Sequence, residues 1–583
     1  MERAVPASLE GTSTPVVVAG MHRSGTSLVA SWLAAAGVDM GERLLAADAR
    51  NPKGYFEDEG FLELNRRMLQ EAVPAGEPGH ADWGWTESER LDRDGFAAHQ
   101  EAARALLDNA VRPAGRRAAE APSPSATGGR FWGWKDPRTT LLLDFWDGLL
   151  PEARYVFLYR FPWEVADSMQ RLGAAVFLEH PEYAYRIWTF YNRHLLDFAR
   201  RHRARCLLLS VDALLGAPER FWPLLQTKLG LDLPAVPFAR LWEEGLFART
   251  TGDDPLPSWV AALHPECAAL LAELDRAADL PSGRGEIPPP AARRPDRGVS
   301  GVSSVPGSLE EPVDLSIVIP CHNDGEFLIE AVASAERSAP ARSEILIVND
   351  GSQDPRTLAV LAVLRRAGCR VIDQENAGLA AARNRGFTEA RGRYLLPLDA
   401  DNRLRPGFPA AAVEVFASSP EAGVVYGDRQ EFGCRNGRVT VPELDLNSLL
   451  RSNSIDACAA LRRTVWEQCG GYDGAMPAQG WEDWDLWIGA AERGWRFHRL
   501  PEVTFEYRVR PGSMASGLLR AEVGEPLRIY MFDKHRELYR SRLPALLTAQ
   551  HERAEVEARL AGVSAERERL GRELATLQGE LSA

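Results

Sequence analysis

A short apolar strand that runs straight into a glycine-rich turn constrains the fold of this chain more than any other segment. Residues 16–27 read VVVAGMHRSGTS. A strand, turn and helix of this kind place backbone N–H groups and a helix N-terminus around an anion, which is typical of parallel α/β domains that bind phosphate. Thr26 replaces the lysine of a nucleoside-triphosphate loop, and the cation lies inside the turn as Arg23. The turn therefore predicts an anionic donor other than ATP, and it disfavours a nucleotide kinase.

Length and charge indicate several soluble domains without a nucleic-acid partner. At 583 residues the chain is too long for one hydrophobic core, so three or four domains are expected. The net charge of −14 disfavours nucleic-acid binding, and anionic ligands must then be bound by local cations and backbone amides. Seven scattered cysteines without a CxxC pair fit a reducing compartment.

The same sequence predicts a cytoplasmic location. No stretch approaches the roughly 20 apolar residues of a membrane span, and the N-terminus lacks the apolar core of a signal peptide. We expect a cytoplasmic protein, with peripheral association at the inner face of a membrane as a further expectation.

Composition divides the chain into five segments. Residues 1–14 are expected to be disordered, residues 15–281 alternate strands and helices, and residues 282–312 are a linker rich in Pro, Gly and Ser. Residues 313–545 alternate short apolar strands with helices, which predicts a second α/β domain with a largely parallel sheet. Residues 546–583 place apolar side chains in a heptad rhythm, which favours a coiled coil that forms an oligomer or binds an assembly partner. A single solvated helix packed on its own domain is the alternative.

The first domain carries a second candidate phosphate site. Residues 155–169 read YVFLYRFPWEVADSM, a strand that ends at Arg160 and a helix that carries Ser168. Together with the glycine-rich turn, this segment resembles the sulfotransferases that use 3′-phosphoadenosine 5′-phosphosulfate (PAPS). The stretch WGWKDPRTT is also similar to a segment of the protein-tyrosine and bacterial branches. The resemblance implies that donor binding involves Arg23, Ser24, Gly25, Thr26, Ser27, Arg160 and Ser168.

Sulfuryl transfer requires a cation for the sulfuryl oxygens and a base for the acceptor hydroxyl. We expect Arg23 to be the cation. The segment NPKGYFEDEG offers Glu57 as the base, since similar branches carry a glutamate there; a solvated acidic loop is the alternative. Asp136 is expected to be a structural partner of Lys135 or Arg138. The tryptophans of this domain could stack on an adenine or a sugar, or belong to the core.

Four motifs follow one another in the second domain. They are LSIVIPCHND, ILIVNDGSQD, NAGLAAARNRG and YLLPLDADN. In open α/β sheets, ligands bind beyond the carboxyl ends of the strands, where three of these motifs lie. Asp399 and Asp401, one residue apart, can share a divalent ion that bridges a diphosphate, and Mg²⁺ or Mn²⁺ suits such oxygen ligands.

The ordered set resembles the family 2 glycosyltransferases of the GT-A fold, although His322 replaces the usual Tyr and Asn349 the first Asp. The resemblance implies an inverting, metal-dependent enzyme that takes a UDP-, GDP- or dTDP-linked sugar. It assigns the metal to Asp399 and Asp401. It assigns donor binding to Pro320, Asn323, Asp350, Gly378, Arg383 and Asp399.

The stretch GGYDGAMPAQGWEDWDLW offers the base for this second reaction. By the same resemblance, Asp483 of its Glu-Asp pair is the catalytic base, with Glu482 and Asp485 as neighbours that orient it or bind acceptor. The alternative is a helix N-terminus that is merely enriched in acids. Arg508, in the later Tyr-Arg pair, is expected near the diphosphate.

The combined interpretation is one polypeptide with two transferases. One transfers sulfate from PAPS to a hydroxyl, and the other transfers a sugar to a glycan or glycolipid acceptor of the cell envelope. The alternative is an active glycosyltransferase whose sulfotransferase-like domain is a non-catalytic module that binds acceptor or serves as a scaffold.

Overall fold

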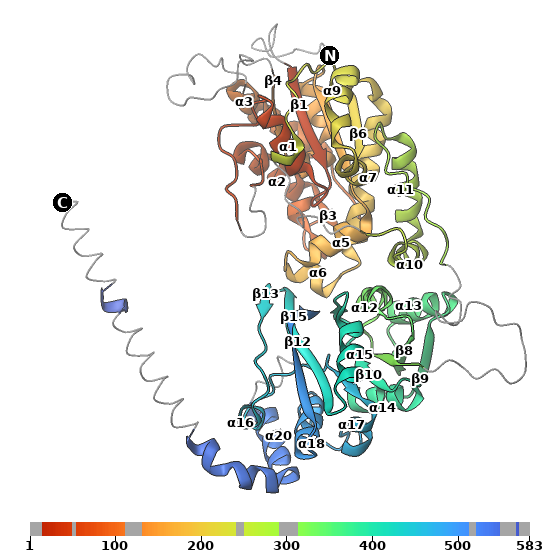
Figure 1. The fold of residues 1–583 in the computed structure, drawn as a ribbon. Coiled ribbons are helices and arrows are strands. Elements are labelled where there is room, and N and C mark those ends of the chain that lie inside the picture. The colour runs from red at the N-terminus through yellow and green to blue at the C-terminus, as the bar shows by residue number, and fades with distance from the viewer. Residues whose placement is uncertain are drawn as a thin grey trace, which may run out of the picture.

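Two α/β domains, stacked end to end, make up the described chain (Figure 1). The computed structural model describes residues 14–48, 54–110, 131–240, 250–290, 313–511, 521–548 and 567–570. Most of the coiled coil expected over residues 546–583 and most of the expected linker lie outside these ranges. Thr14, expected in the disordered start, belongs instead to the first strand, because it pairs in register with Phe131.

The first domain is built on a parallel sheet with the strand order β4-β1-β5-β6. Its strands are β1 (Thr14–Gly20), β4 (Phe131–Lys135), β5 (Arg154–Tyr159) and β6 (Cys206–Ser210). Nearly every residue of these strands is buried, as expected of a parallel sheet with helices on both faces. A small ribbon of β2 (Gly79–His80) and β3 (Trp85–Thr86) lies apart from the sheet.

The helices of this domain cover the sheet and extend toward the second domain (Figure 1). They are α1 (Thr26–Ala35), α2 (Glu59–Ala72), α3 (Gln100–Ala110), α4 (Leu143–Leu149), α5 (Pro162–Gln170), α6 (Ala175–Glu179), α7 (Tyr183–Arg201), α8 (Val211–Gly216), α9 (Phe221–Leu229), α10 (Leu256–Leu263) and α11 (Pro265–Ala277).

The second domain has a mixed sheet with the order β11-β15-β12-β14-β10-β7-β8-β9, and β13 pairs with β12. Its strands are β7 (Leu315–Cys321), β8 (Ser343–Asp350), β9 (Arg370–Gln374), β10 (Tyr394–Pro397), β11 (Arg403–Leu404), β12 (Ala422–Gly433), β13 (Gly437–Val439), β14 (Ala460–Arg462) and β15 (Arg496–Val509). The half from β10 to β9 is parallel as expected. The sheet as a whole is not, because β14 joins β10 and β12 antiparallel.

The helices of the second domain complete the α/β arrangement, so the expected fold class is confirmed for both halves. They are α12 (Gly325–Ser338), α13 (Pro355–Arg366), α14 (Leu379–Glu389), α15 (Phe408–Ser418), α16 (Leu446–Leu449), α17 (Arg463–Cys469), α18 (Glu482–Glu492) and α20 (Ala521–Lys534). Among the described residues, no helix combines the length and apolar character needed to cross a membrane.

The two domains are joined by packing as well as by the chain. One continuous cluster of buried apolar residues includes members of both domains. At one point the backbones nearly touch: a Cβ on Gly173 would lie 2.3 Å from the carbonyl oxygen of Gly433. Ion pairs cross the boundary as well, including Arg356 with Glu182 at 2.6 Å and Arg337 with Asp254 at 2.8 Å.

Candidate active sites

The glycine-rich turn between β1 and α1 forms the floor of the first site. Gly20 lies so close to β5 that a Cβ would lie 2.4 Å from the carbonyl oxygen of Leu158. Its N–H donates to Oγ1 of Thr140 at 3.0 Å, which ties the turn to the segment after β4. Gly25 precedes α1 with φ of +77°, and the buried Thr26 begins that helix. The turn therefore points the N-terminus of α1 at the site.

The structure brings the two predicted phosphate motifs together. Nε of Arg23 donates to Oγ of Ser168 at 2.8 Å, and Nη1 of Arg160 donates to the carbonyl oxygen of Arg23 at 3.4 Å. Burial and the adjacent Arg160 cation lower the pKa of Arg23. The guanidinium of Arg160 also pairs with the buried carboxylate of Glu164 at 2.9 Å. The two arginines therefore place positive charge at the turn, which suits a bound anion.

Two buried side chains in the turn have no hydrogen-bond partner within the described chain. They are Nε2 of His22 and Oγ of Ser24. Buried polar groups nearly always have hydrogen-bond partners. The unpartnered atoms of His22 and Ser24 therefore fit a site in which a bound anionic substrate supplies the missing partners. His22 stacks on Trp83 with ring centroids 3.9 Å apart, and burial together with Arg138 holds its pKa well below the ordinary value. No sequence pattern singles out His22, because a loop histidine carries no spacing signal.

Glu57 lies in a buried ion pair, which excludes a solvated loop. Its Oε1 accepts from Nζ of Lys135 at 2.5 Å, and Nη1 of Arg138 lies 4.0 Å from its Oε2. The carbonyl oxygen of Tyr55 accepts from both Lys135, at 3.1 Å, and Oγ of Ser27, at 3.1 Å. The candidate base is thus connected to the glycine-rich turn.

The remaining expectations for this domain concern structural residues. Asp136 accepts from the backbone N–H and Nη1 of Arg138, both at 3.1 Å, and from Asn65 at 2.9 Å. It is therefore a structural partner, as expected. Trp85 and Trp134 are fully buried in the core, while Trp83 reaches the site through His22.

The second site is a cleft of about 590 Å³ at the carboxyl ends of β7, β8 and β10. Most of the predicted residues line it: Pro320, Asp350, Gly378, Arg383, Asp399, Asp401 and Asp483. Asn323 is not among the lining residues. Its Oδ1 instead accepts from the backbone N–H groups of Gln353 and Asp354, at 2.8 and 3.0 Å, so it shapes the neighbouring loop.

Asp350 orders a loop of the cleft through both of its carboxylate oxygens. Oδ1 accepts from the N–H of Ala377 at 2.9 Å and from Gln374 at 2.7 Å, and Oδ2 accepts from the N–H of Gly378 at 2.9 Å. The loop packs closely, since a Cβ on Gly378 would lie 2.0 Å from Nε2 of Gln479. The geometry therefore shows Asp350 as a loop-ordering residue at the wall of the cleft.

Two arginines hold the aspartate pair. Arg383 donates to Oδ1 of Asp399 at 2.6 Å and to Oε1 of Glu482 at 2.7 Å. Arg510 donates to Oδ2 of Asp401 at 3.0 Å. Burial, with the carboxylates of Asp399 and Asp324 nearby, raises the pKa of Asp401 to about 6. Crowded carboxylates of this kind favour a bound cation.

The donor set fits a metal ion that is shared with a diphosphate. Each aspartate of the pair is held by an arginine through one oxygen, which leaves the other for a cation. No group of three or more acidic, histidine or cysteine side chains in the described ranges forms a complete metal cage. Mg²⁺ and Mn²⁺ commonly bind through one or two carboxylates plus substrate phosphates and water. Asp399 and Asp401 match that pattern.

The candidate base of the second site lies in the first turn of α18. Asp483 accepts from Nδ2 of Asn453 at 2.9 Å and from the N–H of Trp484 at 2.8 Å. Burial and the neighbouring Glu482 raise its pKa to about 8. Perturbed carboxyl groups in clefts are typical of functional sites. Asp485 instead faces away, toward Lys534 and His535 of the C-terminal helical region, so it neither orients the base nor lines the cleft.

Several cleft residues were not predicted. Asn453 and Asp456 lie in an irregular segment before β14, Asp324 precedes α12, and Arg510 follows β15. Arg508 was expected near the diphosphate, but it does not line the cleft. It is fully buried behind residues 399–402, which carry Asp399 and Asp401 and are called the aspartate loop below. The neighbouring Arg510 occupies the cleft in its place.

Comparisons with known proteins find one family model that matches within each domain. Residues 15–235 match the model of the Sulfotransferase family, and residues 316–468 match that of Glycosyl transferase family 2. The O-antigen biosynthesis protein RfbC of Myxococcus xanthus is 30% identical over 234 residues, which are 39% of this chain and 18% of that protein. The Poly-beta-1,6-N-acetyl-D-glucosamine synthase of Staphylococcus aureus (strain COL) is 28% identical over 122 residues, 21% of this chain and 30% of that protein.

These relatives are much longer than the matched region. The chain spans 23% and 18% of the length of the first two curated relatives, the former being the uncharacterized protein y4gI of Sinorhizobium fredii (29% identical over 215 residues, 35% of this chain). Among solved structures, S. aureus TarS 1-349 in complex with UDP-GlcNAc superposes with a TM-score of 0.32 at 17% identity, over 37% of this chain and 65% of that one.

Proposed function

We propose that this chain, which carries a sulfotransferase family domain at residues 15–235 and a glycosyl transferase family 2 domain at residues 316–468, is a bifunctional transferase. One domain transfers the sulfuryl group of PAPS to a hydroxyl, and the other transfers a sugar from a nucleotide sugar to a glycan or glycolipid. The observation that carries the proposal is the convergence of Asp399, Asp401 and Asp483 on one cleft.

In the glycosyltransferase reaction, the acceptor hydroxyl attacks the anomeric carbon as the bond to the diphosphate breaks. Asp483 takes the hydroxyl proton, and its raised pKa makes it a competent base near neutral pH. Asp399 and Asp401 would hold Mg²⁺ or Mn²⁺, which when bound supplies positive charge to the leaving diphosphate. Arg383 keeps Asp399 and Glu482 in fixed orientation. Displacement from the opposite face inverts the anomeric centre.

In the sulfotransferase reaction, the acceptor oxygen bonds to sulfur as the bond from sulfur to the 5′-phosphate oxygen breaks. Arg23, Arg160 and Ser168 bind the phosphates of the donor, and the N-terminus of α1 faces them. Glu57 takes the acceptor proton while Lys135, hydrogen-bonded to it at 2.5 Å, orients the carboxylate. The product that leaves is adenosine 3′,5′-bisphosphate (PAP).

The names of the relatives support a setting in envelope polysaccharide synthesis. One relative is described as an O-antigen biosynthesis protein and another as a Poly-beta-1,6-N-acetyl-D-glucosamine synthase. We extend that setting to this chain as part of the proposal, with a glycan or glycolipid acceptor common to both domains.

A second candidate is an active glycosyltransferase whose sulfotransferase domain is a scaffold. The observation that favours it is a buried contact between the domains: Gln170, in α5 of the first domain, accepts from Arg403 and Arg508 of the second. A domain that had lost catalysis could be retained for that contact alone.

One experiment tests both candidates. Purified protein receives labelled PAPS, a panel of nucleotide sugars and candidate glycans, with Arg23→Ala and Asp401→Ala variants alongside. We expect Arg23→Ala to abolish sulfate transfer only and Asp401→Ala to abolish sugar transfer only. Sulfate transfer unchanged in Arg23→Ala would refute the first mechanism, and sugar transfer in excess chelator would refute the metal role. Sugar transfer with no release of PAP under any condition would favour the scaffold.

A further inference from the structure

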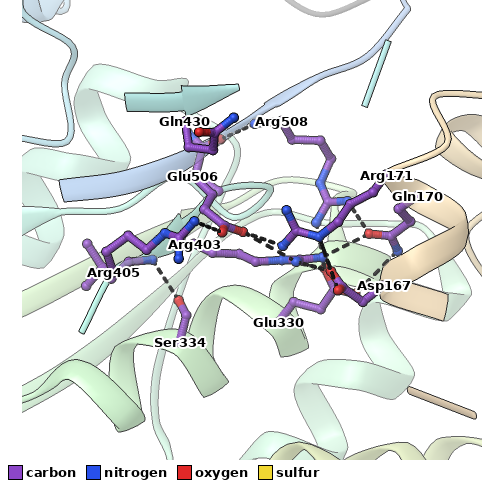
Figure 2. A network of polar contacts seen from close by, with 12 residues as sticks. Asp167, Gln170, Arg171, Glu330, Ser334, Arg403, Arg405, Gln430, Glu506 and Arg508 are labelled. Carbon is purple, nitrogen blue, oxygen red and sulfur yellow. Dashed lines mark hydrogen bonds and ion pairs between the residues drawn. The ribbon is translucent and has the colours of Figure 1, made fainter. Parts of the chain in front are cut away.

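Helix α5 of the first domain presents residues to both candidate sites. Ser168, in the last turn of the helix, accepts from Arg23 at 2.8 Å. Asp167 and Gln170, on either side of it in the sequence, instead reach into the second domain (Figure 2). Gln170 is only 2% exposed, so its amide is committed to this contact.

Two arginines hold the aspartate loop of the second domain from behind. Nε of Arg508 donates to the carbonyl oxygen of Asp401 at 2.9 Å, and its backbone N–H donates to Oδ1 of Asn402 at 3.0 Å. Arg403 follows Asn402 directly in the sequence and begins β11. The position of the loop therefore depends on where these two side chains are anchored.

Both arginines are anchored on α5 of the other domain. Oε1 of Gln170 accepts from Nη2 of Arg403 at 3.1 Å and from Nη1 of Arg508. Asp167 accepts from Nη1 of Arg403. Within the second domain, Glu330 also binds both arginines, each at 2.6 Å, and Glu506 lies 3.6 Å from Nη1 of Arg403 (Figure 2).

Buried guanidinium groups require acceptors for their donors, and leaving one unmatched is costly. Glu330 cannot satisfy both arginines alone, since each guanidinium has five N–H donors in a planar fork. Gln170 and Asp167 supply acceptors that align the two forks. The first domain thus completes the support of a loop that belongs to the second.

We propose that Gln170 and Asp167 are positioning residues for the metal-binding loop of the glycosyltransferase domain, acting through Arg508 and Arg403. This inference rests on the proposed metal role of Asp399 and Asp401. It makes the sulfotransferase domain a structural part of the second active site, whether or not the first domain is itself catalytic.

The test measures binding of Mn²⁺ with a nucleoside diphosphate by titration calorimetry on the full chain. The probe is whichever of UDP, GDP or dTDP binds the wild type most tightly. Gln170→Met removes the acceptor at similar side-chain volume, and Gln170→Glu keeps an acceptor oxygen. Arg337→Ala is the matched control. It breaks a different interdomain ion pair, Arg337 with Asp254, and neither of these residues lines the cleft.

We expect Gln170→Met to weaken Mn²⁺-dependent binding by roughly 10- to 100-fold, as for other residues that support metal ligands. Gln170→Glu and Arg337→Ala should bind close to the wild type. Thermal unfolding reports whether each variant is folded. If Gln170→Met does not fold, Asp167→Asn takes its place, with a smaller expected loss of Mn²⁺-dependent affinity.

Two results would overturn the inference. One is a folded Gln170→Met variant that binds Mn²⁺ and nucleotide with wild-type affinity. If that variant does not fold, the same result in Asp167→Asn counts. The other is an equal loss in Arg337→Ala, which would indicate general loosening of the interface. Absence of Mn²⁺-dependent nucleotide binding in the wild type would instead refute the proposed function on which the inference rests.

Discussion

Asp483 and Glu57 are both buried carboxylates in candidate sites, but their partners differ. Among the described residues, the hydrogen bonds to Asp483 come from neutral donors, Asn453 and the N–H of Trp484, and Asp483 lies beside the acidic Glu482. Glu57 instead accepts from the Lys135 ammonium. Burial and a like charge raise the pKa of Asp483 to about 8, as expected of a group whose neutral form is favoured. The two candidate bases therefore lie in different electrostatic surroundings.

Asp483→Asn should abolish sugar transfer and leave donor binding intact. Loss of a general base typically costs about 10²–10⁴ in rate. Because the base acts in its ionised form, kcat/KM of the wild type should rise with pH and level off above about pH 8. Initial rates across a pH series test this. A flat profile would show that Asp483 does not limit the reaction.

Glu57→Gln should lower kcat for sulfate transfer by about 10²–10⁴ while the affinity for PAP stays the same. The amide keeps the size of the side chain but cannot take a proton. Turnover and PAP binding are measured separately on the same preparation. A variant that loses PAP binding and turnover together would indicate that Glu57 only holds Lys135 in place.

At the scale of elements, the C-terminal helix α20 is fastened to α18 by a histidine. His535 contacts Asp485 through Nε2 and Glu492 through Nδ1, both at 2.9 Å, just beyond the end of α20. Although burial alone would lower the pKa of His535, these carboxylates raise it above the ordinary value. Both ring nitrogens then donate, so the contact requires the imidazolium form.

The stability contributed by His535 should therefore depend on pH. Because the pKa of His535 is higher in the folded than in the unfolded chain, the contact contributes its full stability below the unfolded pKa of about 6.5. That contribution is lost as the pH rises through the folded-state pKa. His535→Gln should destabilise the chain by about 1–2 kcal/mol near pH 6 and much less near pH 9. Thermal unfolding of both proteins at the two pH values provides the measurement. An equal difference at both would mean that the histidine is neutral.

The elements also show what could be predicted from the sequence. The turn after β1 and the strand ends at Asp350 and Asp399 were predictable, because local motifs at carboxyl ends of parallel strands must converge. The antiparallel β14 and the role of Asn453 were not, since they depend on pairings between remote segments. Gln170 carried no signal at all, because its partners Arg403 and Arg508 lie 233 and 338 residues away in the other domain.

At the scale of the whole molecule, ion pairs at the interface join the two domains. Asp167 and Arg171 of the first domain pair with Arg403 and Glu506 of the second. The arginines Arg403 and Arg508 also lie over the ring of Phe432. Breaking such buried pairs strands an uncompensated charge. Because a shared apolar cluster surrounds them, we expect the domains to behave as one body.

A protease site inserted within residues 291–312 tests this expectation. After cleavage the two halves should co-elute in size-exclusion chromatography, even in high salt, because buried pairs are weakly screened. Gly173→Val should separate them, since a Cβ there would lie 2.3 Å from the carbonyl oxygen of Gly433. Gly148→Ala, at an open position, is the control. Cleaved wild-type halves that elute separately would contradict a permanent interface.

The contact of Gln170 with Arg403 and Arg508 also bears on how such a chain can evolve. Modular genes recombine freely when each unit keeps its own active site within its own boundaries. Here a graft of the second domain onto a new partner would carry its candidate catalytic groups but omit part of their support. Descendants should therefore inherit the pair together, and substitutions at Gln170 should be accompanied by compensating changes around Arg508.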